Sequence, residues 1–233
     1  MVGVILAAGY GTRMYPFTKY KAKCLFKYDG KTVLHHLIDN FHSANIKQII
    51  IITNDRFFRQ IYDEVKYTDG VQLISNHTFN PDERLGASND LKLVLNKCKV
   101  EDDVIMSACD KIYNFNIKDF ISFNKTSDCS SLAYYIENNI NKLTKTGIIQ
   151  FKPNGQISFY EKPKNPPSHN ASLPIYILKH EVVALIKRIH LNSDSPGQMI
   201  QELVKKFKFN AYKTKKAIDC NDLNDGTISS KAI

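Results

Sequence analysis

Apolar residues follow two spacings along the first 140 residues, and the two spacings alternate. Continuous apolar runs are typical of strands buried on both faces of a sheet, and they occur at 2–8, 46–53, 71–75, 103–109 and 130–136. In the segments between them apolar residues recur at helical spacing, which predicts helices over 31–44, 56–67, 88–98 and 116–124. Repeated strand–helix units predict right-handed crossovers and a largely parallel sheet with helices on both faces. We expect Ser88 to cap the helix over 88–98.

The pattern changes after about residue 140. Two short segments, 147–151 and 157–162, flank an Asn-Gly turn at 152–156 and predict a β-hairpin. The segments that follow predict a strand at 172–178, helices at 180–191 and 195–207, and a strand at 209–214. Neither a repeat nor a flexible linker interrupts the sequence. We therefore expect one α/β domain over 1–233, in which the part over about 141–233 adds a wall to a site built by the part over about 1–140.

Composition agrees with an ordinary globular protein. The chain has 233 residues, 24% of them charged, and a formal net charge of +9. The lysines are scattered among acidic residues, and the sequence has no arginine-rich arm, RNP motif or zinc-finger pattern, so nucleic acid is not an expected partner. A lysine-rich surface with a site for an anionic small molecule accounts for the charge better.

Two further patterns indicate the compartment. No run approaches the roughly 20 apolar residues needed to span a bilayer, and no basic region precedes the first apolar run, so we expect neither a membrane anchor nor a signal peptide. The five cysteines are widely spaced without a C-x-x-C pair, which argues against a zinc site and a disulfide framework. We expect a reduced, cytoplasmic protein with Cys98 and Cys109 buried as small hydrophobes. A homo-oligomer is left open.

The loop after the first apolar run carries the strongest chemical signal. Ligands of open α/β sheets bind beyond the carboxyl ends of strands, and Gly9 and Gly11 let backbone N–H groups approach phosphate oxygens there. Arg13 offers a planar fork of donors, and Lys19, Lys21 and Lys23 follow within one loop's reach. These residues favour a polyphosphate ligand.

Two common phosphate motifs do not fit this loop. The dinucleotide fingerprint G-x-G-x-x-G would need glycine where Met14 stands, and the P-loop pattern before Lys31 and Thr32 would need glycine at Leu25. Hydride transfer and Walker-type hydrolysis are therefore disfavoured.

The stretch "LAAGYGTRM", followed by Pro16, Thr18 and "AKCL", resembles the signature of the sugar-1-phosphate nucleotidylyltransferases (nucleotide-sugar pyrophosphorylases). It departs from that signature where Ala22 replaces the usual proline before Lys23. The resemblance extends over about residues 2–222. It implies a Rossmann-like three-layer α/β/α fold (GT-A-like) with a mostly parallel mixed sheet, a nucleotide-binding half over about 1–140 and an acceptor-binding half over about 141–233.

The resemblance also implies site residues. Arg13, Lys23 and Lys162 would be catalytic, and "RLGAS" at 84–88 resembles a second glycine loop that meets the base. The nucleotide-binding residues that it implies are Leu6, Ala7, Ala8, Gly9, Tyr10, Gly11, Thr12, Arg13, Lys23, Leu85, Gly86 and Ala87. We also expect the ring of Tyr10, inside the glycine loop, to be placed to cover the base or the triphosphate.

Metal and acceptor positions follow from the same resemblance. Asp110, which ends "SACD", and Asp219 in "AIDCND" would share one Mg²⁺. Gly147 would lie against the sugar, while Glu161 and Lys162 of "EKP" would hold its hydroxyls and its phosphate. Two departures are Cys109 in place of a glycine before Asp110, and Pro174 in place of a glycine in the sugar-facing strand. The reaction implied is transfer of a nucleoside monophosphate from a nucleoside triphosphate to a sugar 1-phosphate, with release of pyrophosphate.

Two alternatives remain open at this point. The first is a CTP-dependent cytidylyltransferase acting on phosphocholine or another small phosphate or phosphonate. The second is a non-catalytic nucleotide-sensing domain, which would keep the glycine loop without Lys23 or the metal-binding aspartates. The sequence names neither the base nor the phosphorylated small-molecule acceptor.

Overall fold

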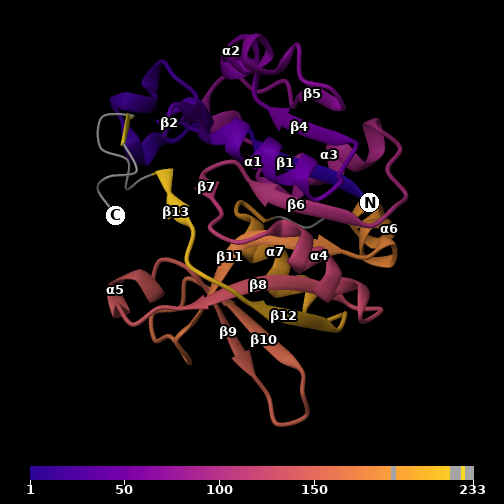
Figure 1. Ribbon diagram of the computed structural model, residues 1–233. Coiled ribbons are helices and arrows are strands. Elements are labelled where there is room, and N and C mark those ends of the chain that lie inside the picture. The colour runs from indigo at the N-terminus through magenta and orange to yellow at the C-terminus, as the bar shows by residue number, and fades with distance from the viewer. Residues whose placement is uncertain (190–192, 221–226, 229–233) are drawn as a thin grey trace.

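A nine-stranded mixed sheet forms the centre of the protein (Figure 1). The structure is a computed structural model that describes residues 1–189, 193–220 and 227–228. The strand order is β10 (Ile157–Glu161), β9 (Gly147–Phe151), β11 (Asn170–Leu178), β6 (Val104–Ala108), β1 (Val2–Ala7), β4 (Ile49–Thr53) and β5 (Val71–Ser75). Two more strands extend it, because β8 (Ser130–Ile136) pairs with both β11 and β12 (Phe209–Lys213).

The strands of the first half are parallel, and β11 joins the second half to them. β1 pairs in parallel with β4 and β6, and β4 with β5. β11 runs antiparallel to β6, while β8 and β9 run antiparallel to β11 and therefore in the direction of β6. The prediction of a mostly parallel mixed sheet in an α/β fold is confirmed.

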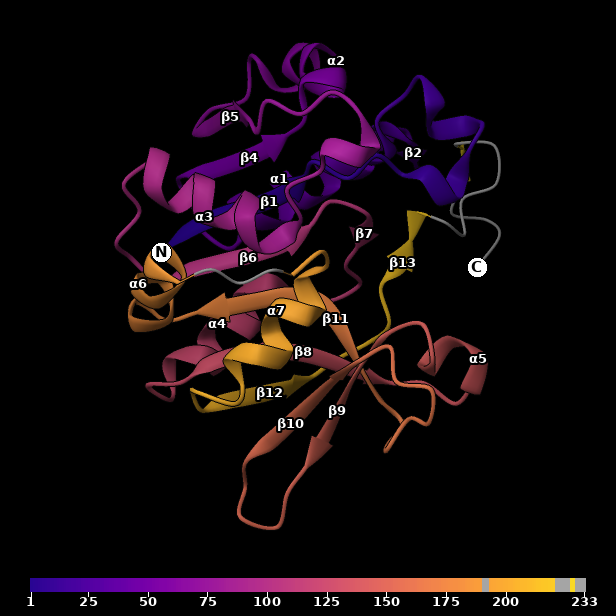
Figure 2. The same cartoon turned by 180° about the vertical axis from the view of Figure 1, so that it is seen from behind.

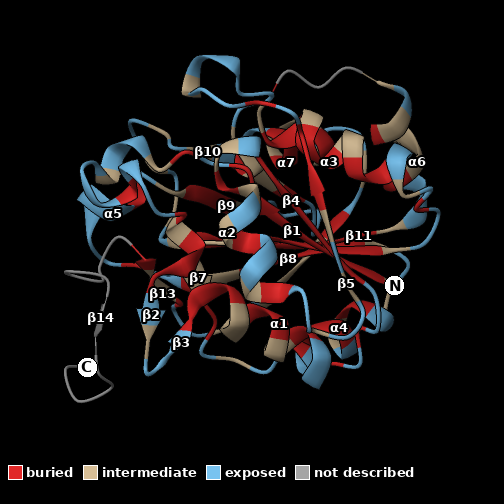
Figure 3. Cartoon of the chain, turned by 90° about the horizontal axis from the view of Figure 1, so that it is seen from above, coloured by how far each residue is buried: buried red, intermediate tan, exposed pale blue. Residues whose placement is uncertain are grey.

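Helices cover both faces of the sheet (Figures 2 and 3). α1 (Val33–Ser43), α2 (Asp55–Val65) and α4 (Ile117–Lys125) pack in one core cluster, and α3 (Ala87–Lys97), α6 (His180–Arg188) and α7 (Pro196–Leu203) pack in the other. Alternate residues of β1 serve the two clusters, Ile5 facing the first and Leu6 the second, as the side-chain period of a strand requires. Among the described residues, no helix is both long and apolar enough to cross a membrane.

Short elements line the carboxyl edge of the parallel strands. Three 3₁₀ turns follow β1, and two small sheets lie beside them. These elements are η1 (Thr12–Met14), η2 (Phe17–Lys19), η3 (Lys23–Leu25), the pair β7 (Lys111–Ile112) with β13 (Ile218–Asp219), and the group β14 (Thr227–Ile228), β2 (Lys27–Tyr28) and β3 (Lys31–Thr32). A further 3₁₀ turn, η4 (Pro81–Glu83), precedes α3, and α5 (Ile140–Leu143) precedes β9.

The expected elements are present within one to a few residues at their ends, with two corrections. Ser88 does not cap α3, whose N-cap is Gly86. The Ser88 hydroxyl instead donates to the Ser193 carbonyl at 3.2 Å, because the chain before α7 lies against this helix end.

Cys98 and Cys109 are half-buried rather than buried, and all five cysteines are free. The last two residues of the expected helix over 180–191 lie outside the described residues.

Candidate functional site

The glycine loop leaves β1 with its carbonyl groups turned into the protein. The Cys109 N–H donates to the Leu6 carbonyl, the Thr53 hydroxyl to that of Ala7 and the Asn54 amide to that of Ala8, at 3.2, 3.2 and 2.9 Å. By contrast, the N–H groups of Gly9, Tyr10 and Gly11 donate to no other group within the described part of the chain. A row of unoccupied N–H groups beyond a strand end can bind phosphate oxygens.

The fold requires glycine at only one of the two glycine positions in the loop. Gly11 has a φ of 65°, and a Cβ there would lie 3.0 Å from the Thr18 side chain, whose hydroxyl donates to the Gly11 carbonyl at 2.7 Å. The fold therefore needs glycine at this position. A Cβ on Gly9 would meet no heavy atom within 4 Å. The fold does not need glycine there, whereas close approach of a ligand to the backbone does.

Tyr10 points into the protein, which corrects the expectation that its ring covers a ligand. The residue is 5% exposed, and its hydroxyl donates to Thr78 Oγ1 at 2.8 Å. Thr78 Oγ1 donates in turn to Asn76 Oδ1, and Asn76 Nδ2 to Asp90 Oδ1, each at 2.8 Å. Burial raises the pKa of Asp90 to about 6, and the Asn76 hydrogen bond offsets part of that increase. Only the backbone of Tyr10 is available to a ligand.

Lys23, Asp110 and Asp219 lie together at this edge of the sheet. Lys23 Nζ is 2.7 Å from Asp110 Oδ2 and 3.9 Å from Asp219 Oδ1. Burial opposes the charge of Asp110, but the ammonium groups of Lys111 and Lys23 outweigh it and hold the pKa of Asp110 at about 2. Burial also opposes the charge of Lys23, and Asp110 outweighs it and raises the pKa of Lys23. Lys23 and Asp110 are therefore both charged near neutral pH.

Backbone pairing explains why residues so distant in sequence meet. Asp110 lies between β6 and β7, and Asp219 stands opposite Lys111 in the antiparallel pair β7–β13. The Cys220 N–H donates to the Asp110 carbonyl at 3.0 Å. Beneath these residues lies a small apolar cluster made by Phe26, Val33, Ile112 and Cys220, with Met14, Tyr28 and Ile218 packed against it. The rest of the expected segment, residues 221–222, lies outside the described residues.

The two carboxylates suit a magnesium ion that also contacts a substrate. One ammonium group already reaches both, so a single cation between Asp110 and Asp219 is sterically reasonable. Within the described ranges no group of three or more His, Cys, Asp or Glu residues could hold a metal alone. Mg²⁺ commonly takes one or two carboxylates and completes its shell with water and phosphate oxygens. The residues present therefore fit Mg²⁺ bound together with a phosphorylated substrate.

The second glycine loop is engaged by the protein itself. Gly86 has a φ of 82°, and a Cβ there would lie 2.8 Å from the Ser193 carbonyl oxygen. The Ala87 N–H donates to the Asp194 carbonyl and the Ser88 N–H to the Ser193 carbonyl, both at 3.2 Å. Leu85 is partly exposed. Of the residues expected to meet a base, Ala87 therefore has its backbone donor already occupied.

Glu161 is the last residue of β10, and Lys162 follows it. The Ser195 hydroxyl donates to Glu161 Oε1 at 2.9 Å, and Lys162 Nζ lies 3.3 Å from the same oxygen. Lys162 has a φ of 47°, a left-handed conformation that is uncommon for a non-glycine residue. Gly147 is buried, and a Cβ there would lie 2.3 Å from the Phe159 ring, so packing alone requires this glycine.

The cations of the opening segment are mostly at the surface. Arg13 lies in η1 and is exposed, and no ion pair or hydrogen bond of its guanidinium occurs within the described ranges. Thr12, beside it, is exposed too. Lys19 and Lys21 are exposed, and their ammonium groups lie over the rings of Tyr20 and Phe26. Lys23, with a side chain 14% exposed, is the one that turns inward.

Three residues that sequence reasoning passed over belong to the site. Lys111 pairs with Asp219, Asn54 fixes the Ala8 carbonyl, and Ser195 holds Glu161. Lys111 directly follows Asp110 in "CDKIY", and this adjacency to an expected metal ligand was the available signal. The other two are small polar residues at helix N-caps, which have an ordinary structural role and therefore gave no signal.

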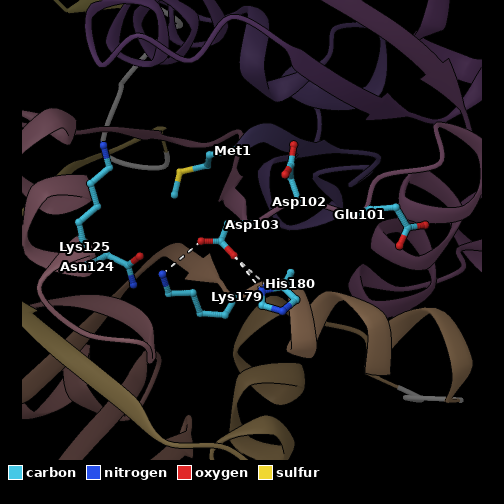
Figure 4. Close-up of a pocket in the computed structure, with 8 residues that line it drawn as sticks. All are labelled: Met1, Glu101, Asp102, Asp103, Asn124, Lys125, Lys179 and His180. Carbon is cyan, nitrogen blue, oxygen red and sulfur yellow. Dashed lines mark hydrogen bonds and ion pairs between the residues drawn. The ribbon is translucent and has the colours of Figure 1, made fainter.

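A cavity of about 410 Å³ lies at the opposite edge of the sheet (Figure 4). Asp103, just before β6, lies among its lining residues and pairs with Lys179 at 3.2 Å and with His180 at 3.8 Å. The amino ends of β1 and β6 are at this edge, so the cavity is separate from the glycine loop. None of the residues expected to bind substrates lines it.

The sequence is similar to those of sugar-1-phosphate nucleotidyltransferases. A mannose-1-phosphate guanyltransferase of Yarrowia lipolytica is 30% identical over 190 residues, which are 80% of this chain and 51% of the relative. The UTP–glucose-1-phosphate uridylyltransferase AglF of Haloferax volcanii is 28% identical over 173 residues, 72% of this chain and 68% of the relative. The chain thus spans about half the length of the first relative and about two thirds of the second.

Structural similarity points to the same fold. A UDP-glucose pyrophosphorylase solved with UDP-glucose superposes with a TM-score of 0.78 at 18% identity, covering 94% of each chain. At the level of sequence families, the nucleotidyl transferase family matches residues 2–223. A match of this extent, over a chain whose glycine loop, lysine and carboxylates meet at one sheet edge, shows that the protein belongs to the nucleotidyl transferase family.

Proposed function

We propose that the protein transfers a nucleoside monophosphate from a nucleoside triphosphate to a sugar 1-phosphate, with Mg²⁺ as cofactor. The observation that carries the proposal is the meeting of Lys23, Asp110 and Asp219 beside the unoccupied N–H groups of the glycine loop. The two relatives are named for hexose 1-phosphates, which supports a sugar phosphate as acceptor. Their names differ in the base, so the base is left to experiment.

The reaction exchanges one phosphoanhydride bond for another. An oxygen of the sugar phosphate forms a bond to the α-phosphorus, the bond from that phosphorus to the β-phosphate oxygen breaks, and pyrophosphate leaves. The second pKa of a phosphate monoester is about 6, so the nucleophile is already ionised and no general base is needed. The protein must hold two polyanions together and neutralise the leaving group.

The residues of the chain divide these tasks. The N–H groups from Gly9 to Gly11 bind phosphate oxygens, and Arg13 and Lys23 balance the charge of the β- and γ-phosphates. Asp110 and Asp219 hold Mg²⁺, which neutralises charge on the phosphates when it is bound. The loop carbonyls are tied back by hydrogen bonds, so the N–H groups are preorganised and need not reorganise during the reaction.

The acceptor half supplies the groups for the sugar phosphate. Lys162 balances its phosphate, and Glu161 accepts hydrogen bonds from sugar hydroxyls. The Glu161 side chain is 11% exposed and is oriented by Ser195, so it presents a fixed acceptor rather than a mobile surface charge. Gly147 lies opposite Glu161 across the β9–β10 pair and keeps that wall flat.

We place this reaction in the cytoplasm, with small molecules rather than nucleic acid as partners. The five cysteines are widely spaced in the sequence, without a C-x-x-C pair, and this spacing supports a reducing compartment.

A pyrophosphate-release screen tests the proposal. Each nucleoside triphosphate is combined with a panel of sugar 1-phosphates and with phosphocholine, in Mg²⁺ and in EDTA. We expect release with at least one sugar 1-phosphate in Mg²⁺ and none in EDTA. Lys23→Ala and Asp110→Asn should each lower turnover by more than about tenfold with unchanged circular dichroism, because the first removes a cation that balances the phosphates and the second removes a carboxylate that holds Mg²⁺.

The matched control for Lys23 is Lys31→Ala, since Lys31 is exposed and pairs with the exposed Asp39 rather than with Asp110 or Asp219. Near wild-type turnover in both site variants would overturn the residue assignment. Pyrophosphate release only with CTP and phosphocholine would mean that the acceptor is a small alcohol phosphate and not a sugar 1-phosphate. Nucleotide binding without release for any pair would indicate a sensing domain instead of an enzyme.

A further inference from the structure

Lys111 brings a second ammonium group to the two carboxylates of the site. Its Nζ forms an ion pair with Asp219 Oδ2, and 17% of its side chain is exposed. Lys23 Nζ lies between the carboxylates, 2.7 Å from Asp110 Oδ2 and 3.9 Å from Asp219 Oδ1. Lys111, Asp219, Lys23 and Asp110 thus form a row of charges that alternate in sign. Asp219 pairs with both lysines.

The position of Lys111 is fixed by the backbone. Lys111 and Asp219 are directly opposite in the antiparallel pair β7–β13, so their side chains leave the same face. Ile112, the next residue, is buried in the apolar cluster with Cys220, which follows Asp219. The ion pair is therefore anchored on both sides by buried neighbours, unlike a surface pair between mobile side chains.

An ammonium group at Asp219 and a divalent cation at the same carboxylate exclude one another. Like charges at contact distance repel strongly where water is largely excluded, and both lysine side chains here are more than four-fifths buried. Two carboxylates already balance two lysines. A divalent cation added alone would leave this edge with a surplus of positive charge, whereas a triphosphate arriving with it would supply the missing negative charge.

We propose that Lys111 is a positioning residue that keeps Asp219 from binding metal until a nucleotide arrives. Its ammonium holds Asp219 in the nucleotide-free protein and moves to phosphate oxygens when Asp219 binds a divalent cation. This inference rests on the proposed function, because the phosphates come from the nucleotide substrate. It makes binding of the metal depend on binding of the nucleotide.

Mn²⁺ binding to nucleotide-free protein tests the role of Lys111 without any measurement of activity. The free Mn²⁺ signal in electron paramagnetic resonance gives the affinity for wild type, Lys111→Gln, Lys111→Met and Lys111→Arg. We expect weak binding in wild type and in Lys111→Arg. Binding in the two neutral variants should be about tenfold tighter, because Asp219 is released from its ammonium partner. Lys111→Gln can still donate a hydrogen bond to Asp219 and so protects the β7–β13 pairing.

The control is Lys31→Gln, which removes an exposed lysine from its pair with Asp39 and should leave Mn²⁺ affinity unchanged. Equal affinity in all Lys111 variants, or equally tight binding in Lys111→Arg, would overturn the inference. Failure of both neutral variants to fold would also overturn it, because Lys111 would then be a structural residue. If no variant binds Mn²⁺, the metal assignment fails with it, while pyrophosphate release still decides the proposed function separately.

Discussion

Single residues of the glycine loop separate what the fold requires from what a ligand requires. Gly11 is held by its positive φ and by contact with Thr18, and it would be glycine in a protein without a substrate. Gly9 has open space where a Cβ would lie. No contact within the fold calls for glycine at that position, which is consistent with the proposal that phosphate oxygens approach its backbone.

Replacing each glycine by alanine tests this distinction. Gly11→Ala should lower the free energy of unfolding by about 1 kcal/mol or more, because alanine is strained at φ 65° and meets Thr18. Gly9→Ala should leave thermal stability within about 0.5 kcal/mol of wild type and weaken nucleoside triphosphate binding by about tenfold or more. Thermal denaturation and titration calorimetry measure the two effects. A destabilised Gly9→Ala protein, or one with unchanged affinity, contradicts this account.

The residue scale also shows where prediction from sequence stops. The glycines could be located by their spacing after a buried strand, because loop chemistry is local, whereas the resemblance to a family signature distinguished Lys23 from Lys19 and Lys21. The direction of Tyr10 could not, since its partner Thr78 comes from the segment after β5. Lys111 was overlooked for the same reason, because its pairing with Asp219 joins residues about a hundred positions apart.

Elements are tied together by buried polar groups as well as by apolar packing. The hydrogen bonds from Tyr10 through Thr78 and Asn76 to Asp90 connect the glycine loop, the end of β5 and the first turn of α3. Period and length were enough to predict these helices and strands. The cap of α3 was not predictable, because Ser88 bonds to Ser193, which precedes a different helix. An irregularity in the sheet was not predictable either: the pairing of β8 with β11 shifts register between Ser172 and Tyr176. This interval contains Pro174, which has no backbone N–H to donate.

Asp90 gives this network a dependence on pH. Its pKa of about 6 in the folded protein lies above the ordinary value of 3.8, so the protonated form is favoured on folding. The stability it contributes is complete below about pH 4 and is lost as pH rises through 6. The loss is about 3 kcal/mol, since one pKa unit corresponds to about 1.4 kcal/mol.

Asp90→Asn removes the charge and keeps an oxygen for the Asn76 amide. At pH 8 this variant should be more stable than wild type by up to about 3 kcal/mol, and the two should converge near pH 4. Urea denaturation at both pH values measures the difference. Asp69→Asn, at an exposed acidic residue, is the matched control and should show no such trend. A constant difference across this range would mean that burial of Asp90 does not govern its charge.

At the scale of the whole molecule, the two halves of the chain, before and after about residue 140, share one sheet and two cores. Ile175 and Tyr176 of β11 pair with Ser107 and Met106 of β6 across the boundary between them. Each core cluster draws residues from both halves, for example Ile5 with Ile175 in one and Leu6 with Tyr176 in the other. The alternation of strands and helices predicted the layers, but the insertion of β11 beside β6 could not be read from local patterns.

This shared construction implies that the chain unfolds as one unit. In native-state hydrogen exchange the central amides of β1 and β11 should report the same opening free energy, because opening either half exposes both cores. The β9–β10 hairpin, which extends beyond the helices in Figure 1, should exchange earlier. A fragment of residues 1–140 should lack cooperative unfolding, since without β11 strand β6 becomes an apolar edge. A cooperatively folded fragment, or distinctly lower protection of β11 than of β1, would mean that the halves are separate domains and that the site is assembled by docking rather than built into one sheet.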